Sequence, residues 1–225
     1  MKQIIYFVFF ILFSGCVHAS GVGSDGFPDS WWTPVPDDQV KGWEIPPQAA
    51  HRDQGEVVLS KRTELGQFSN LTAAAFEMDG IKYASIEGLW QGMKYPETAS
   101  DERNNSQVVW PYTREQVYLM SGFEAKKAGD IANENMRKLG IKYITYKGEK
   151  VEYNGSGMQR HYEIIYNASL NKVLQNEPLK KLLLSTKQLH FFPDHKQQPN
   201  PNPAYLYHDI YMKIRENLKS QKVGT

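Results

Sequence analysis

Cysteine is almost absent from this sequence: its 225 residues contain one, Cys16. A chain with one cysteine cannot form an internal disulfide, and the residues after Cys16 can supply neither a thiolate metal site nor a cysteine nucleophile. A domain of about 200 residues buries enough surface to fold without disulfides. His190 and His195 are too isolated to suggest a metal site. We therefore expect no metal and no cofactor.

An excess of charge of either sign is also lacking. The chain has 26 Lys and Arg against 25 Asp and Glu, a formal net charge of +1. Binding of nucleic acid through bulk charge requires a basic surface, which this balance does not provide. The partner that we expect is a small molecule. A hydrophobic content of 40% with 12% aromatic residues suits one globular domain.

Long apolar runs are missing except near the N-terminus, where Lys2 precedes an apolar stretch from Ile4 to Phe13. A run of about 10 residues suits the core of a signal peptide, whereas a membrane-spanning helix needs about 20. We therefore predict export in a bacterium, to the periplasm or the outer membrane, with a soluble mature part.

Two processing sites compete in this signal. Cleavage after Ala19 fits a small-x-small pattern, with Val17 and Ala19 at the recognised positions. The residues 13–16, Phe-Ser-Gly-Cys, also resemble a bacterial lipobox, in which Cys16 is lipidated and begins the mature chain. We slightly favour the lipoprotein, in which case the protein would contact the membrane only through its lipid anchor.

The remaining chain divides into a leader and a domain. After the signal at 1–19, residues 20–54 are rich in Gly, Pro and Asp but include Trp31, Trp32 and Trp43. Disordered linkers avoid aromatic residues, so we expect these tryptophans to pack on the domain or to line its cleft. The domain itself is predicted to span residues 55–220.

Periodicity within the domain predicts a mainly helical α+β fold with a small β-sheet. Strands are expected at 57–59 and 189–192, and hairpins at Asp79-Gly80 and at Lys147-Gly148. Helices are expected at 86–95, 123–139 and 158–175, followed by a short helix that Pro178 opens and a closing helix through Leu218. Phe123 and Met158 are predicted to lie on buried helix faces.

The helix predicted at 86–95 carries a polar stripe. Glu87, Gln91 and Lys94 recur at i, i+4 and i+7 beside an apolar face, and Ser85 is the expected N-cap. The helix dipole favours a carboxylate in the first turn. The stripe could wall a polar pocket, or it could be a solvated flank with weak side-chain pairing.

Two segments carry a resemblance to a known family. Residues 66–71 read Gly-Gln-Phe-Ser-Asn-Leu, and residues 83–95 read Tyr-Ala-Ser-Ile-Glu-Gly-Leu-Trp-Gln-Gly-Met-Lys-Tyr. They resemble the G-x-F-S-N-F and W-P-T-S-E-H-x-F-Q-A-x-K-F motifs of the NADAR/YbiA-like N-glycosidases. The family's glutamate, aromatic residue, glutamine and lysine fall on Glu87, Trp90, Gln91 and Lys94. The segment 125–129, ending in Gly129, is similar to the family's A-x-x-x-G.

The resemblance implies hydrolysis of an N-glycosidic bond, in a ribosylated nucleotide-like compound or in ADP-ribose attached to a base. Such chemistry needs a carboxylate at the oxocarbenium-like C1 and a proton for the leaving nitrogen. Glu87 suits the first role. Lys94 could donate the proton, hold a phosphate or form a Schiff base. The substrate-binding residues implied by the resemblance are Phe68, Ser69, Asn70, Trp90, Gln91 and Asp194.

One stretch departs from the family pattern, which continues with D-x-x-W-G and G-x-N-x-L-G. Residues 193–203 read Pro-Asp-His-Lys-Gln-Gln-Pro-Asn-Pro-Asn-Pro, with Asp194 at the family's aspartate but neither the Trp-Gly pair nor the glycines. Half of the site is therefore rebuilt or missing. Two alternatives follow, a non-catalytic envelope lipoprotein that binds nucleotides or ADP-ribose and a purely structural envelope lipoprotein.

Overall fold

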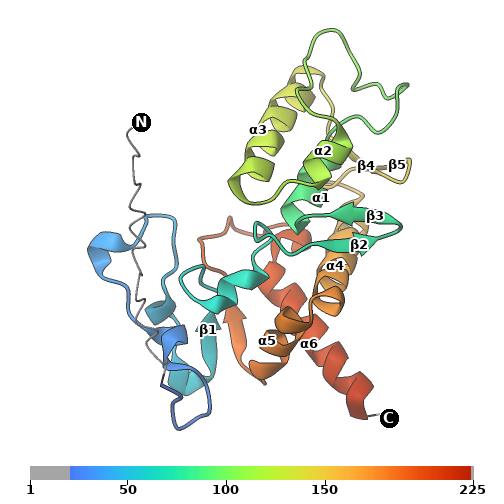
Figure 1. Ribbon diagram of the computed structural model, residues 1–225. Coiled ribbons are helices and arrows are strands. Elements are labelled where there is room, and N and C mark those ends of the chain that lie inside the picture. The colour runs from blue at the N-terminus through green and yellow to red at the C-terminus, as the bar shows by residue number, and fades with distance from the viewer. Residues whose placement is uncertain (1–20, 224–225) are drawn as a thin grey trace, which may run out of the picture.

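The computed structural model describes residues 21–223, so the predicted signal and Cys16 lie outside the described residues. The described part is α+β and mainly helical, as predicted (Figure 1). Its strands are β1 (Glu56–Val58), β2 (Phe76–Met78), β3 (Ile81–Tyr83), β4 (Ile144–Tyr146), β5 (Glu149–Val151) and β6 (His190–Phe192). Its helices are α1 (Ile86–Gly92), α2 (Arg114–Tyr118), α3 (Gly122–Lys138), α4 (Met158–Gln175), α5 (Glu177–Ser185) and α6 (Tyr207–Val223). Across residues 21–223 no helix combines the length and apolarity that a bilayer crossing requires.

The strands form three two-stranded ladders in the described residues instead of one small sheet. β1 pairs with β6 in parallel, with Val57 opposite Phe191, and this joins the two ends of the domain. β2–β3 and β4–β5 are antiparallel hairpins. Asp79 and Gly80 both have positive φ, 54° and 78°, which is the conformation that a tight two-residue hairpin turn requires.

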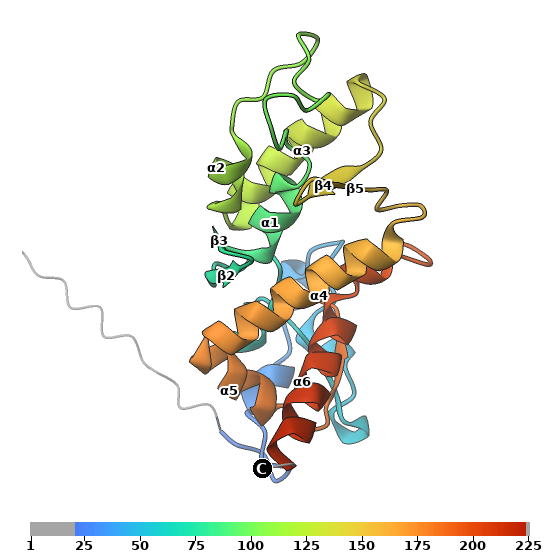
Figure 2. The ribbon, with the colours of Figure 1, turned by 90° about the vertical axis from the view of Figure 1, so that its right-hand side faces the viewer.

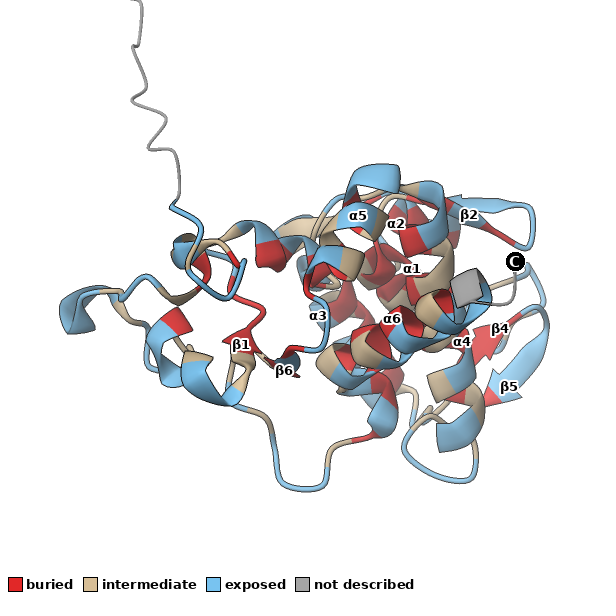
Figure 3. Ribbon diagram, turned by 90° about the horizontal axis from the view of Figure 1, so that it is seen from below, coloured by how far each residue is buried: buried red, intermediate tan, exposed pale blue. Residues whose placement is uncertain are grey.

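Helix α4 runs through the middle of the molecule (Figure 2). α1, α2, α3 and the β4–β5 hairpin lie on one side of it, and α5, α6 and the β1–β6 pair lie on the other. The buried residues, red in Figure 3, lie where these elements face one another. One large cluster of apolar side chains spans both sides of α4 and includes Phe27 and Trp31 of the leader.

Helix α1 is shorter than predicted and ends at Gly92 instead of Tyr95. The chain tightens there, because the amides of Lys94 and Tyr95 donate to carbonyls only three residues back. Arg103 and Arg114 are buried against this end, and both donate to the carbonyl of Met93. Together with the amide of Thr145, which donates at 3.1 Å, the guanidinium groups satisfy a carbonyl that has no partner within the helix.

Two predicted core positions are wrong. The side chains of Phe123 and Met158 are 79% and 43% exposed. Both occupy the first turn of their helices, where the outermost side chain extends past the packing partner. The buried face of α4 includes His161, Ile165, Ala168 and Lys172. Two of these side chains are polar, so the spacing of apolar residues does not reveal the whole face.

The leader is docked on the domain through two of its three tryptophans. Trp31 is buried and its indole nitrogen donates to Glu64 at 2.6 Å, and that of Trp32 donates to the carbonyl of Glu56 at 2.8 Å. Trp43 is 55% exposed, so the prediction that it packs on the domain is wrong. Its segment is held by backbone bonds instead: Lys196 donates to the carbonyl of Trp43 at 3.0 Å.

Candidate functional site

The polar stripe of α1 forms a continuous chain of hydrogen bonds. The Gln91 amide nitrogen donates to Oε1 of Glu87 at 2.7 Å, and the Gln91 amide oxygen accepts from Nζ of Lys94 at 2.7 Å. Lys94 also donates to Oδ1 of Asn133, on α3, at 2.9 Å. One amide therefore connects a carboxylate with an ammonium group. Because Gln91 and Lys94 are buried, the stripe is not a solvated flank.

Three local features hold Glu87 at the beginning of α1. Ser85 is the N-cap, as predicted: its Oγ accepts from the amide of Gly88 at 2.9 Å and donates to the carbonyl of Met120 at 2.9 Å. The amide of Glu87 donates to the carbonyl of Asn70 at 2.9 Å. The 66–71 segment and the helix are therefore brought together.

Glycine at position 129 allows α3 to approach this chain closely. A Cβ atom there would lie 1.9 Å from Oε1 of Gln91, which is far inside contact distance. The A-x-x-x-G resemblance thus has a physical reason in this structure, because the amide that connects Glu87 with Lys94 occupies the space of the missing side chain.

Burial shifts the pKa values of Glu87 and Lys94 in opposite directions. It raises the pKa of Glu87 above its ordinary value of 4.5, and the hydrogen bond from Gln91 and the charge of Lys94 only partly oppose this. Burial also lowers the pKa of Lys94 to about 8, while the nearby charges of Glu87 and Asp130 act the other way. A raised carboxyl pKa and a lowered amine pKa in one cluster are typical of catalytic groups.

The indole ring of Trp90 is surrounded by three aromatic rings and one ammonium group of the same chain. Its ring stacks on His161 with centroids 4.4 Å apart, and Nζ of Lys94 lies 4.4 Å from its centroid. Tyr153 and Tyr205 meet it edge-on at 5.2 and 6.0 Å. The ring therefore holds the ammonium of Lys94 by a cation–π contact, which leaves little of it free to stack on a base.

Within the described residues, the side chains of Phe68 and Ser69 make no hydrogen bond or ring contact with the α1 stripe. Phe68 is fully buried and packs on Tyr211 and Phe191, with ring centroids 4.9 and 6.1 Å away. Its predicted contact with a base is wrong, because no face of the ring is open. Ser69 is buried, and its carbonyl accepts from Nζ of Lys172 at 3.0 Å. Both residues therefore anchor the 66–71 segment to the core.

Asn70 lies at the site, and part of its side chain has no partner. Its Oδ1 atom is buried and makes no hydrogen bond within residues 21–223. Because its carbonyl accepts from Glu87, this unpaired oxygen belongs to the same end of α1. An unpaired buried acceptor of this kind is rare in proteins.

Asp194 belongs to a different cluster. Its carboxylate accepts from His195 at 2.8 Å, from Tyr207 at 2.9 Å and from Lys61. Burial opposes the charge, yet these hydrogen bonds hold the pKa of Asp194 at about 2. No partner of this carboxylate comes from α1 in the described chain, so the structure does not join Asp194, which the resemblance implied as a substrate-binding residue, to the Glu87 cluster. The backbone of Ile45 bonds to the carbonyl of Asp194 at 2.9 Å, which makes the cluster part of the leader's docking site.

Sequence reasoning missed Asn133, Tyr153, His161 and Tyr205, all of which contact the stripe or Trp90. His161 carried a usable signal, since it is the one histidine on the inner face of a long amphipathic helix. Tyr205 carried none, because it follows a Pro- and Asn-rich stretch that reads only as a loop.

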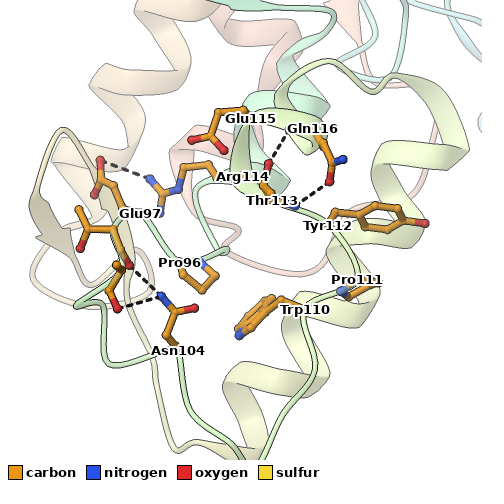
Figure 4. Close-up of a pocket in the computed structure, with 12 residues that line it drawn as sticks. Pro96, Glu97, Asn104, Trp110, Pro111, Tyr112, Thr113, Arg114, Glu115 and Gln116 are labelled. Atoms are coloured by element: carbon orange, nitrogen blue, oxygen red, sulfur yellow. Dashed lines mark hydrogen bonds and ion pairs between the residues drawn. The ribbon is translucent and has the colours of Figure 1, made fainter.

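Two surface hollows lie away from this cluster. The larger, of about 430 Å³, follows the C-terminal end of α1 (Figure 4). Trp110 and Pro96 line one part of it, and Glu97 lies beside Arg114 in another. The second, of about 360 Å³, is lined by Asp79, Tyr146 and other polar residues. Neither contains a predicted site residue. Among residues 21–223, no three His, Cys, Asp or Glu side chains gather as metal ligands would.

Comparisons with known proteins give one similarity. No family model and no curated protein matches the sequence. Among solved structures, the chain is similar to the NMR structure of the E. coli protein YbiA, with a TM-score of 0.47 and 18% sequence identity, over 74% of this chain and 85% of that chain.

Proposed function

We propose that the protein is an N-glycosidase that hydrolyses the N-glycosidic bond of a ribosylated nucleotide-like or ADP-ribosyl compound. The observation that carries the proposal is the Glu87–Gln91–Lys94 chain, in which a carboxylate and an ammonium group are connected by one amide. The motif resemblance of residues 66–71 and 83–95 agrees with this choice.

The two charged groups divide the chemistry between them. As the bond from C1 to the leaving nitrogen breaks, the charge of Glu87 stabilises the oxocarbenium-like carbon. Glu87 then takes a proton from the water whose oxygen bonds to C1. Lys94 supplies the proton that the leaving nitrogen gains, since a pKa of about 8 makes it a stronger acid than an ordinary lysine.

Two other roles for Lys94 were open from the sequence. Holding a phosphate takes several free N–H groups, and Lys94 already donates two of its three to Gln91 and Asn133, which leaves one for a proton transfer. A Schiff base requires the neutral amine, which at a pKa of about 8 is roughly a tenth of the population at pH 7. Borohydride added during turnover would trap a Schiff base as a mass increase on Lys94, and we expect no such adduct.

The test is release of ribose or ADP-ribose from N-ribosyl compounds by the purified protein. Glu87→Gln keeps the shape and removes the charge, and we expect the rate to fall about 100- to 10,000-fold. Glu124→Gln, at an exposed position on α3, is the matched control and should retain the rate. Equal activity of the wild-type and Glu87→Gln proteins would contradict the proposal. Saturable binding without turnover would favour the non-catalytic binding module instead.

We also propose that the protein is exported and that Cys16 is the site of lipid attachment. The support is the sequence alone, since Cys16 lies outside the described residues. Metabolic labelling with a radioactive fatty acid should mark the wild-type protein and not the Cys16→Ser variant. Labelling of both would contradict lipidation at this residue.

A further inference from the structure

Residues 193–203, the stretch that departs from the family pattern, lead into a segment that contacts the candidate site. It ends in the short 3₁₀ helix η6 (Pro203–Tyr205). Asn202 caps η6, because its Oδ1 accepts from the amide of Ala204 at 2.9 Å, and Ala204 is buried. The Asn202 amide nitrogen donates to the carbonyl of Tyr153 and to Nδ1 of His161. The loop is therefore tied to α4 and to the strand end that precedes it.

This anchoring places Tyr205 beside Trp90 and His161, with ring centroids 6.0 and 5.7 Å away. Tyr205 is 38% exposed, so part of its ring faces solvent. Gln197 donates to the backbone carbonyl of Tyr205 at 3.5 Å, and the Tyr205 hydroxyl takes no part in a hydrogen bond within the described residues. Burial, the neighbouring Tyr153 and the negative charge of Glu87 raise the pKa of Tyr205, which keeps the hydroxyl neutral and able to donate.

His161 offers a second unpaired donor. Two contacts fix the Asn202 amide, since Oδ1 accepts from Ala204 and the nitrogen donates to Tyr153. That nitrogen therefore also donates to Nδ1 of His161, 3.3 Å away, and the ring proton must be on Nε2. Nε2 is buried and has no partner among residues 21–223. Burial lowers the pKa of His161 to about 4, so the ring is neutral at pH 7.

We propose that Tyr205, Tyr153 and His161 form a subsite for a planar nitrogen heterocycle, the leaving group of the substrate. The heterocycle packs against the exposed part of Tyr205. One of its acceptor atoms takes a hydrogen bond from the Tyr205 hydroxyl, and binding brings a second acceptor within reach of Nε2 of His161, which is covered in the free protein. A buried donor without a partner, such as Nε2 of His161, is rare in proteins. Tyr205 and His161 both contact Trp90, which follows Glu87, the carboxylate assigned to C1, on α1. The inference rests on the proposed function for that placement of C1.

Binding to the Glu87→Gln protein tests the subsite without requiring turnover. The probes are adenine, cytosine and nicotinamide, with methyl riboside as a sugar that lacks a heterocycle, and affinity is measured by calorimetry. We expect at least one heterocycle to bind, Tyr205→Ala to weaken it at least tenfold and Tyr205→Phe to weaken it severalfold. Tyr112→Ala, in the hollow beyond α1, is the control and should not change the affinity. No heterocycle binding, or equal affinity with and without Tyr205, would overturn the subsite.

The Nε2 signal of His161 gives a second readout that does not require a substitution in the core. In ¹⁵N NMR of the free protein, Nε2 should show the shift of a protonated ring nitrogen, and a saturating heterocycle should move it. An unmoved signal would remove His161 from the subsite. Failure of the proposed function has a different signature, since it appears as undiminished bond cleavage by Glu87→Gln, whatever the affinity for heterocycles.

Discussion

Lys172 allows the sharpest quantitative prediction. Its side chain is fully buried on α4, and its Nζ donates to the carbonyls of Gln67 and Ser69 at 2.8 and 3.0 Å. The described residues supply no carboxylate to pair with this ammonium group. Burial therefore lowers the pKa of Lys172 to about 7, against an ordinary 10.5. The folded protein then binds one proton fewer than the unfolded chain between these two pH values.

The sign and size of the effect follow from this difference. Because the unfolded state binds more protons, the free energy of unfolding rises as pH increases from about 7 to 10.5. At about 1.4 kcal/mol per pH unit, the 3.5-unit difference amounts to about 5 kcal/mol. Lys172→Met removes this rise and leaves the carbonyl of Gln67 unpaired, at a cost of about 1–3 kcal/mol. The variant should thus lose stability relative to the wild type as pH increases.

Urea unfolding followed by tryptophan fluorescence, at pH values from 6 to 10, measures this difference. Subtracting the variant's curve from that of the wild type cancels the titration of Lys94 and the tyrosines, which both proteins share. Lys181→Met, at an exposed position on α5, is the control, and its curve should run parallel to that of the wild type. A Lys172→Met curve that also runs parallel would refute the assignment of a neutral buried amine.

Three further predictions concern the site and the leader. Gly129→Ala should displace Gln91, cost about 1–3 kcal/mol of stability and reduce turnover, with unchanged kinetics as the contrary result. Turnover should fall as pH rises through about 8, where Lys94 loses its proton, and a rate still rising at pH 9 would contradict its role as the acid. Trp31→Ala should cost about 3–5 kcal/mol and expose the leader to proteases, whereas an unchanged cleavage pattern would argue against docking through Trp31 and Glu64.

The fold was largely predictable because its signals are local. Apolar periodicity located α3, α4 and α6, and Asp79-Gly80 identified a hairpin whose two residues do have positive φ. Helix α2 was missed because five residues contain too little periodicity to recognise. The pairing of β1 with β6 joins residues more than 130 positions apart, and no local pattern specifies such a partner.

The candidate site was predictable where it lies on one helix and not where it is assembled from several elements. Spacing alone placed Glu87, Gln91 and Lys94 on one stripe, and the structure joins them by hydrogen bonds. Asp194 was assigned by position in a motif, and the structure places it with Lys61 and the leader instead. Tertiary contacts decide such cases, since a buried carboxylate pairs with whichever donors the fold brings to it.

The docking of the leader also limits how far the folded domain can lie from a lipid anchor at Cys16. Its first described backbone pairing is the bridge between Val22 and Pro28. If Cys16 carries the proposed lipid, the stretch from Cys16 to Val22 spans at most roughly 20 Å even when fully extended. The folded domain would then stay within a short distance of the membrane that holds it. Substrates would have to be encountered near that surface, and lengthening this stretch with glycine and serine would be the direct way to change the distance.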